Sequence, residues 1–231
     1  MINTVISLLT FFSSTINLNS GKKATLSGTG PPLLFSSGLF GTMPPFIYNE
    51  FLNNLKNNFT IITLNNVLPL EREDIEDVTR SISVENLAFL SHSSFNSDIL
   101  ETDKINSAVL LDPICLPNVN VYGLNSKEID VNYPILIVKS DKLYNSSPSI
   151  PIWQRPNFKQ SVEEVNYENV GHPDILDNMW ANIAKTNGFW DTTNGEKQSF
   201  LDWNYNKDSI KKIRKDYREF VAEKCKSFIL D

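Results

Sequence analysis

The sequence predicts an α/β fold with a mainly parallel central sheet, helices on both faces and long loops at the carboxyl edge of its strands. Two observations carry this prediction. Apolar runs of strand length recur along the chain, and segments with helical spacing of apolar residues stand between them. Continuous apolar strands that alternate with helices are typical of a parallel sheet buried on both faces. The strand runs occupy residues 31–35, 59–64, 86–91, 107–111 and 134–138.

The segments between these runs supply the other elements. Phe46, Phe51 and Leu55 fall at helical spacing, and the acidic stretch at 71–78 favours an exposed helix. Two long segments rich in Pro, Asn and Ser are predicted as loops over the strand ends, where long loops are commonly functional. The remaining expectations are a short helix after Ser93, an antiparallel edge strand within 18–28, loops at 113–133 and 141–168, and an amphipathic helix at 206–230.

Composition fits a single domain that spans residues 1–231 and limits the classes of partner. The chain has 231 residues, an apolar fraction of 41% and a net charge of −6. A chain of this size can fill one core. The acidic balance, without a long basic run, argues against nucleic acid as a partner. The sequence does not indicate an oligomeric state.

The few cysteines and histidines argue against metal chemistry. The chain has two cysteines and two histidines. The cysteines cannot form a disulfide framework and have no metal-ligand spacing. We therefore expect no metal site and no cofactor.

The N-terminal stretch is apolar but short. Residues 1–17 lack the length of a membrane span and the basic start of a secretory signal. We expect a docked N-terminal segment rather than a cleaved signal. This expectation favours a cytoplasmic location, although the sequence leaves the compartment open.

A serine stands where a strand meets a small-residue turn. The strand at 86–91 leads into Ser-His-Ser-Ser-Phe at 91–95. A nucleophile elbow, G-x-S-x-G, holds a serine on such a strained turn. Ser93 is the candidate nucleophile. Ser91 is an acceptable small substitute for glycine, whereas Phe95 departs from the pattern because bulk there would crowd the following helix against the strand.

Two aspartates compete for the role of the acid. Asp112 ends the strand at 107–111, and Asp141 follows the strand at 134–138, the commoner acid position in this kind of fold. The carboxyl ends of parallel strands gather at one edge of a sheet, so both could approach Ser93. The residues favour Asp112 and leave Asp141 as the alternative.

The general base can be named by elimination. His172 lies after the last predicted strand and follows Ser93 and both aspartates, which is the chain order Ser, Asp, His of this kind of hydrolase. His92 adjoins Ser93 and is interpreted as a packing residue. Asp174 and Asp177 are interpreted as charges at the start of the next helix.

Two backbone amides are candidates for the oxyanion hole. Gly38 follows the first strand, where a glycine lets N–H groups approach a developing alkoxide. The amides of Leu39 and Ser94 form the natural donor pair.

These segments together resemble the chlorophyllase-like branch of the α/β-hydrolases, from about residue 31 to residue 191. The most specific match is Gly-His-Pro-Asp-Ile-Leu-Asp at 171–177, which is close to the G-H-x-D-x-L-D histidine loop of that branch. The strand ending in Asp112-Pro113 is similar to its acid-bearing strand, and the His-Ser pair at 92–93 to its G-H-S-x-G-G elbow. Both elbow glycines are missing, as is the histidine before Gly38.

The resemblance implies a cofactor-free carboxylic ester hydrolase with Ser93 as nucleophile, Asp112 as acid and His172 as base. It further implies a bulky apolar ester as substrate, with the phytyl ester of chlorophyll as one example. Aromatic residues near the strand ends could line such a pocket: Phe40, Phe46, Trp153 and Trp190. The alternative is a hydrolase-fold protein that has lost catalysis and serves as a binding or scaffolding module, as Phe95 and the missing glycines would suggest.

Overall fold

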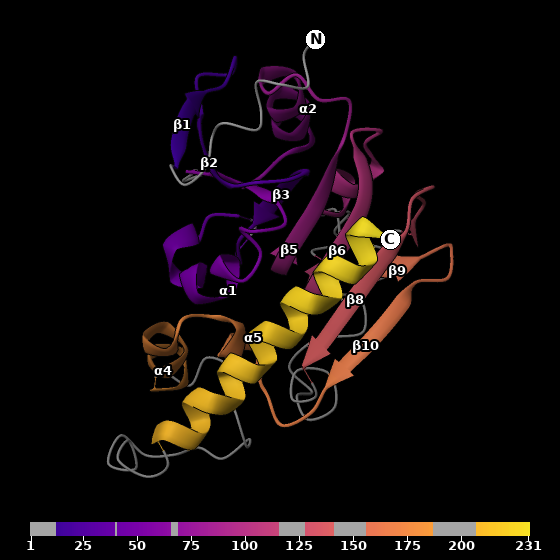
Figure 1. The fold of residues 1–231 in the computed structure, drawn as a ribbon. Helices are drawn as coiled ribbons and strands as arrows, with labels where there is room; N and C mark the ends of the chain where they lie inside the picture. Colours follow the sequence, from indigo (N-terminus) through magenta and orange to yellow (C-terminus); the bar gives the residue numbers. More distant parts are fainter. Residues whose placement is uncertain (1–12, 40, 66–68, 116–127, 141–155, 187–206) are drawn as a thin grey trace.

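A sheet of eight strands forms the centre of the computed structural model, which describes residues 13–39, 41–65, 69–115, 128–140, 156–186 and 207–231 (Figure 1). The strands from β4 to β10 run parallel, and β1 and β2 add an antiparallel hairpin at one edge. The prediction of a mainly parallel sheet is confirmed. In spatial order the strands are β1 (Ser14–Asn17), β2 (Lys23–Gly28), β4 (Thr60–Leu64), β3 (Pro32–Ser36), β5 (Leu87–Phe95), β6 (Ile105–Cys115), β8 (Ile135–Ser140) and β10 (Glu163–Tyr167).

The apolar strands bury both faces of the sheet, so successive residues enter different cores. Leu33 and Phe35 of β3 pack in one apolar cluster, whereas Leu34 between them packs in the other. Helices α1 (Asn49–Asn53) and α5 (Lys207–Leu230) cover the first face, and α2 (Arg72–Ser81) with the 3₁₀ helix η3 (Ser97–Glu101) covers the second. The prediction of helices on both faces is confirmed.

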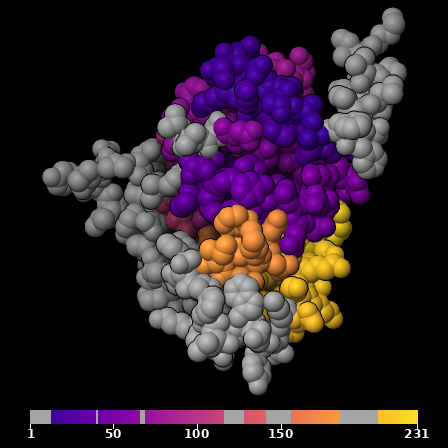
Figure 2. All heavy atoms as spheres, turned by 90° about the vertical axis from the view of Figure 1, so that its left-hand side faces the viewer, coloured from indigo at the N-terminus to yellow at the C-terminus, as the bar shows by residue number. Residues whose placement is uncertain are grey.

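The helices differ from the expectations mainly at their ends. The predicted helix at 46–55 is a 3₁₀ turn, η2 (Pro45–Tyr48), followed by α1. The predicted C-terminal helix at 206–230 is α5, which crosses the sheet diagonally in Figure 1. Helix α4 (Asn178–Thr186) lies beside η2, because the Asp177 amide that precedes it donates to the carbonyl of Ile47 (2.8 Å). Figure 2 shows this side of the molecule, with the orange segment that contains α4 below the purple segments that contain α1.

The two predicted loops contain strands that the sequence reasoning missed. Strand β10 lies within 141–168 and pairs with β8 at the edge of the sheet. Its sequence, Glu-Glu-Val-Asn-Tyr, is polar because an edge strand keeps one side in solvent, so it lacks the apolar run that marks a buried strand. A second sheet joins β7 (Glu128–Ile129) to β9 (Asn157–Phe158). The residues 1–12 of the expected N-terminal segment lie outside the described residues.

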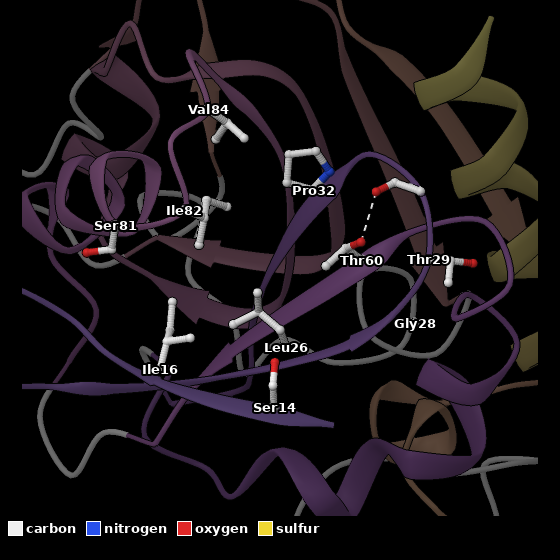
Figure 3. Close-up of a pocket in the computed structure, with 11 residues that line it drawn as sticks. Ser14, Ile16, Leu26, Gly28, Thr29, Pro32, Thr60, Ser81, Ile82 and Val84 are labelled. Carbon is white, nitrogen blue, oxygen red and sulfur yellow. Dashed lines mark hydrogen bonds between the residues drawn. The ribbon is translucent and has the colours of Figure 1, made fainter. Parts of the chain in front are cut away.

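A pocket of about 340 Å³ opens at the amino ends of the strands (Figure 3). Pro32 and Thr60, which begin the parallel neighbours β3 and β4, both line it. Its eleven lining residues are apolar or carry hydroxyls, and none of them has a titratable side chain. The pocket therefore offers no acid–base group, and the candidate residues Ser93 and Asp112 lie toward the opposite, carboxyl ends of β5 and β6.

None of the helices in the described part of the chain has the length and apolar character needed to cross a membrane.

Candidate active site

Ser93 lies near the carboxyl end of strand β5, at the point where the pairing of β5 with β6 becomes irregular. The pairing of β5 with β6 passes from His92–Leu111 to Ser94–Ile114, so Ser93 faces two residues, Asp112 and Pro113. Such a bulge re-aims a side chain out of the regular pleat. Ser93 has φ +67°, a left-handed backbone conformation that side-chain-bearing residues rarely adopt and that clusters at functional sites. The bulge and the left-handed backbone together give Ser93 the strained turn that a nucleophile elbow requires.

Phe95 does not obstruct this turn, contrary to the concern raised by the sequence. The predicted short helix after Ser93 is the 3₁₀ helix η3, which begins only at Ser97 because β5 continues as a strand to Phe95. Phe95 is fully buried in the second core, in the same apolar cluster as Ile99 and Leu100. A glycine is needed where a helix starts directly after the serine and packs closely on the strand, whereas here η3 begins four residues after Ser93.

Asp112 occupies the matching position on the neighbouring strand. It too has a left-handed backbone, with φ +45°, and its side chain is almost completely buried. Ser140 at the end of β8 donates to it twice, from its amide to Oδ1 (2.7 Å) and from its hydroxyl to Oδ2 (2.7 Å). Buried carboxylates require such donors, and these two hold the carboxylate in one orientation.

His172 joins Ser93 to Asp112. It begins the 3₁₀ helix η5 (His172–Ile175), in the loop that follows β10. Its Nε2 lies 2.8 Å from the Ser93 Oγ, and its Nδ1 lies 3.3 Å from Asp112 Oδ2. All three side chains are buried. The structure thus brings together the three residues that the sequence proposed as nucleophile, acid and base.

The alternative acid, Asp141, lies outside the described residues. Its neighbour Ser140 has a role that the sequence reasoning missed, since it orients Asp112. The sequence did contain a signal for this role. Ser140 ends β8, and the carboxyl ends of the parallel neighbours β6 and β8 lie at the same edge of the sheet.

One candidate oxyanion donor lies in the turn after β3, and the other lies in β5, the parallel neighbour of β3. Leu39 lies in the turn after β3 and Ser94 directly follows Ser93 in β5, and β3 pairs with β5 as a parallel neighbour. Leu39 has φ +52° and is 56% exposed, so its side chain points away from the core. The amide of Gly38, just before it, donates to the Tyr48 hydroxyl (3.0 Å).

His92 has polar partners on both ring nitrogens, which the packing interpretation did not foresee. Its Nδ1 lies 2.8 Å from the Tyr48 hydroxyl, and its Nε2 lies 3.1 Å from the carbonyl oxygen of His172. Burial lowers the pKa of His92 well below its usual value, and the nearby charge of His172 lowers it further. His92 is therefore a neutral imidazole, and Tyr48 is a second site residue that the sequence did not reveal.

His92, Asp112 and His172 are also grouped closely enough to hold a metal ion, with ligand atoms within 4.8 Å of one another. Each of the four imidazole nitrogens already has a hydrogen-bond partner in the protein. A metal would have to displace these bonds, so the arrangement fits proton transfer better than metal binding.

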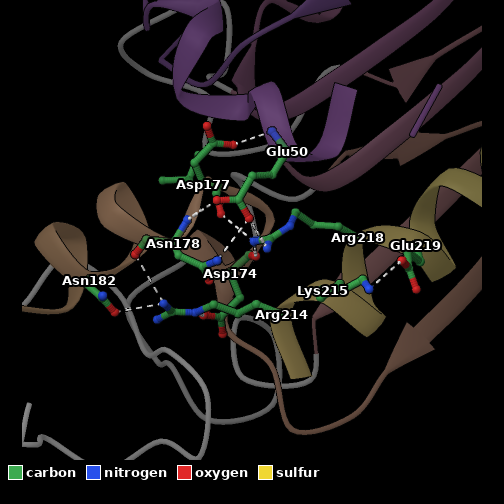
Figure 4. A network of polar contacts seen from close by, with 10 residues as sticks. Glu50, Asp174, Asp177, Asn178, Asn182, Arg214, Lys215, Arg218 and Glu219 are labelled. Carbon is green, nitrogen blue, oxygen red and sulfur yellow. Dashed lines mark hydrogen bonds and ion pairs between the residues drawn. The ribbon is translucent and has the colours of Figure 1, made fainter. Parts of the chain in front are cut away.

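The histidine loop is held by α5 through a buried ion pair (Figure 4). Arg214 Nε donates to Asp174 Oδ1 (2.6 Å), and Asp174 Oδ2 accepts the amide of Gly171 (2.8 Å) next to His172. Asp177 accepts the amide of Glu50 through its side chain (2.7 Å). The interpretation of both aspartates as charges at a helix start was therefore incomplete, because they bind segments distant in sequence.

The two cysteines are poor candidates for a nucleophile. Both are buried, and burial raises the pKa of Cys115 and that of Cys225 to about 12. Only the thiolate reacts, so the raised pKa keeps both thiols in their unreactive protonated form at pH 8.

We expect the cysteines of the folded protein to react neither with Ellman's reagent nor with an alkylating reagent within about an hour at pH 8. After the same sample is unfolded in guanidinium, two thiols per chain should react, which provides the internal control. A rapidly titrating thiol in the folded protein, measured with Ellman's reagent, would contradict the burial argument.

Comparison with known proteins supports the fold but does not show a family to which the chain belongs. No family model and no curated protein matches the sequence. Among solved structures, a membrane phospholipase A described as a bacterial virulence factor matches with a TM-score of 0.51 and 12% identity, over 77% of this chain and 85% of that chain.

Two further structural matches have lower scores. Naproxen esterase from Bacillus subtilis matches with a TM-score of 0.46 and 14% identity, over 77% of this chain and 91% of that one. An alpha/beta fold family hydrolase from Bacillus anthracis str. Sterne matches with a TM-score of 0.43 and 12% identity, over 77% and 97%. The sheet order, the helical layers and the match to the phospholipase A, whose TM-score is above 0.5, show the class: the chain has the α/β-hydrolase fold.

Proposed function

We propose that this protein is a serine carboxylic ester hydrolase that acts through Ser93, His172 and Asp112. One observation carries the proposal: His172 Nε2 lies 2.8 Å from the Ser93 Oγ while its Nδ1 faces Asp112. A serine hydroxyl becomes a nucleophile when a base takes its proton, and the base needs an acid that orients it. The strained backbone at Ser93 supports the same role.

The proposed reaction has two steps. Ser93 Oγ attacks the ester carbonyl as its proton passes to His172 Nε2, and Asp112 stabilises the imidazolium that forms. The alcohol leaves with that proton, and water then hydrolyses the acyl-serine with His172 again as base. The amides of Leu39 and Ser94 are the proposed donors to the oxyanion.

We further propose an apolar ester as the substrate, as the chlorophyllase-like resemblance implies. The support comes from exposed apolar side chains in three places: the oxyanion turn, the segment that follows this turn, and the helix that follows the histidine loop. Leu39, Phe46 and Met179 are each more than half exposed, and Phe46 packs edge-on against Trp180 (5.9 Å between ring centroids). Phe46 and Met179 belong to η2 and α4, which lie side by side on the face seen in Figure 2. The other aromatic candidates, Phe40, Trp153 and Trp190, lie outside the described residues.

We expect a fluorophosphonate probe to label the wild-type protein and Ser93→Ala to abolish the labelling. The same substitution should lower kcat for p-nitrophenyl butyrate by about 10⁴-fold or more, because no other group can form the acyl-enzyme. Mass spectrometry of the labelled peptide and initial-rate kinetics provide the measurements.

Ser91→Ala is the matched control. The Ser91 hydroxyl is buried two residues away and has no hydrogen-bond partner among the described residues. Its loss should leave labelling unchanged. A folded wild-type protein that resists the probe and does not hydrolyse esters would reject the proposal and favour the binding or scaffolding alternative.

A further inference from the structure

We propose that Tyr48 and His92 are positioning residues that connect the backbone of the oxyanion turn to the backbone and ring of His172. The inference rests on the proposed ester hydrolysis for its catalytic consequence, but the connection itself can be tested without activity. Three hydrogen bonds form it, from Gly38 N–H to Tyr48, between Tyr48 and His92, and from His92 to the carbonyl of His172.

The carbonyl group at one end sets the direction of these bonds. The carbonyl oxygen of His172 can only accept, so the His92 Nε2 must carry the proton that is donated to it (3.1 Å). A neutral imidazole with its proton on Nε2 has a lone pair on Nδ1, so the Tyr48 hydroxyl donates to Nδ1 (2.8 Å). The Tyr48 oxygen then accepts the Gly38 amide (3.0 Å). Each group makes the bond that its neighbour requires.

His92 also controls the orientation of the His172 ring. The two imidazoles are stacked, with centroids 4.4 Å apart and planes inclined by 25°. One residue thus contacts His172 both at its carbonyl and at its ring face. Because His172 takes up a proton in the proposed reaction, a neutral neighbour avoids a second positive charge at stacking distance.

Close packing prevents the connection from relaxing. Tyr48 is fully buried, and its ring packs edge-on against Phe35 (5.0 Å) and His92 (5.5 Å). A Cβ atom built on Gly38 would lie 2.9 Å from Met43 Sδ and 3.1 Å from the Tyr48 hydroxyl. The turn therefore packs directly against Tyr48. This contact also fixes the position of the next amide along the chain, that of Leu39.

The tautomers of the histidines provide the first test. The chain has only two histidines, so ¹⁵N-labelled histidine gives two imidazole spin systems. At pH 7.5 we expect the proton of His92 on Nε2 and that of His172 on Nδ1, where it faces Asp112. A positively charged His92, or one with its proton on Nδ1, would overturn the inference whether or not the protein is active.

Removal of one hydroxyl provides the second test. Tyr48→Phe keeps the ring but leaves the Gly38 amide and the His92 Nδ1 without their partner. We expect kcat for p-nitrophenyl butyrate to fall about 10- to 100-fold, with KM within about twofold, since small misplacements of catalytic groups have effects of this size. The imidazole shifts of His172 should change as well.

Tyr133→Phe is the matched control. The Tyr133 hydroxyl is also buried and donates to a carbonyl, that of Leu100 (2.6 Å), but Tyr133 packs in the core on the other face of the sheet. This substitution should lower stability without changing kcat or the histidine shifts. Equal losses of kcat in the two variants would show that Tyr48 acts through general stability and would overturn the inference.

Two substitutions at His92 separate positioning from packing. His92→Gln can place an N–H near the carbonyl of His172, whereas His92→Leu fills a similar volume without a donor. If His92 positions His172, kcat should be higher for His92→Gln than for His92→Leu. If His92 only fills space in this buried place, kcat should be higher for His92→Leu. If the wild-type protein hydrolyses no ester, the proposed function fails, and the tautomers and shifts still decide whether the connection exists.

Discussion

Asp112→Asn is expected to lower kcat for ester hydrolysis by about 10⁴-fold, the size found when a triad acid loses its charge. The structure gives a specific reason. Both oxygens of Asp112 accept hydrogen bonds from Ser140, and Oδ2 also faces His172 Nδ1. An asparagine amide must direct its NH₂ group at one of these donors or at His172. If it donates to Nδ1, the histidine proton moves to Nε2, where it blocks proton transfer from Ser93.

Asp141→Asn separates the two candidate acids. We expect this variant to retain the wild-type kcat, because Asp112 already contacts His172. Circular dichroism should show that both variants are folded, and initial rates with p-nitrophenyl butyrate measure the difference. If Asp141→Asn were inactive and Asp112→Asn active, the acid would have to be reassigned to Asp141.

Arg214→Met is expected to lower the free energy of unfolding by about 3–5 kcal/mol, which is the usual result of removing one partner from a buried ion pair. Side-chain exposure is 1% for Arg214 and 0% for Asp174. The substitution removes the cation that binds Asp174 Oδ1 in this buried place (2.6 Å), and it removes the bond from Arg214 to Asn182 (2.8 Å). Since globular proteins are stable by about 5–15 kcal/mol, the loss is a large part of the total. Urea denaturation provides the measurement.

Lys215→Met is the matched control on the same helix (Figure 4). Lys215 pairs with Glu219, and the two side chains are 70% and 51% exposed. Exposed ion pairs contribute little, so the change should be below about 0.5 kcal/mol. Similar losses in the two variants would contradict the structural account, in which the buried pair stabilises the loop of His172.

Patterns within short segments were enough to predict the central sheet and the candidate site residues. Buried parallel strands such as β3, β6 and β8 are apolar on both faces, so they stand out as continuous runs. Ser93 and His172 were proposed from strand ends, chain order and the scarcity of histidine, and the family resemblance favoured Asp112 over Asp141 as the acid. The polar edge strand β10 was missed because one of its sides faces solvent.

The sequence by itself determined the fold class and made His172 the candidate base, because strand periodicity and residue counts are local properties. Only the tertiary structure decided how the site is supported. Tyr48, Ser140 and Arg214 reach it from elements far apart in the chain, and no local pattern reports which buried polar groups will meet. Phe95 shows the same limit, since its bulk is harmful only where a helix begins directly after the serine, and in the folded chain it fills the core instead.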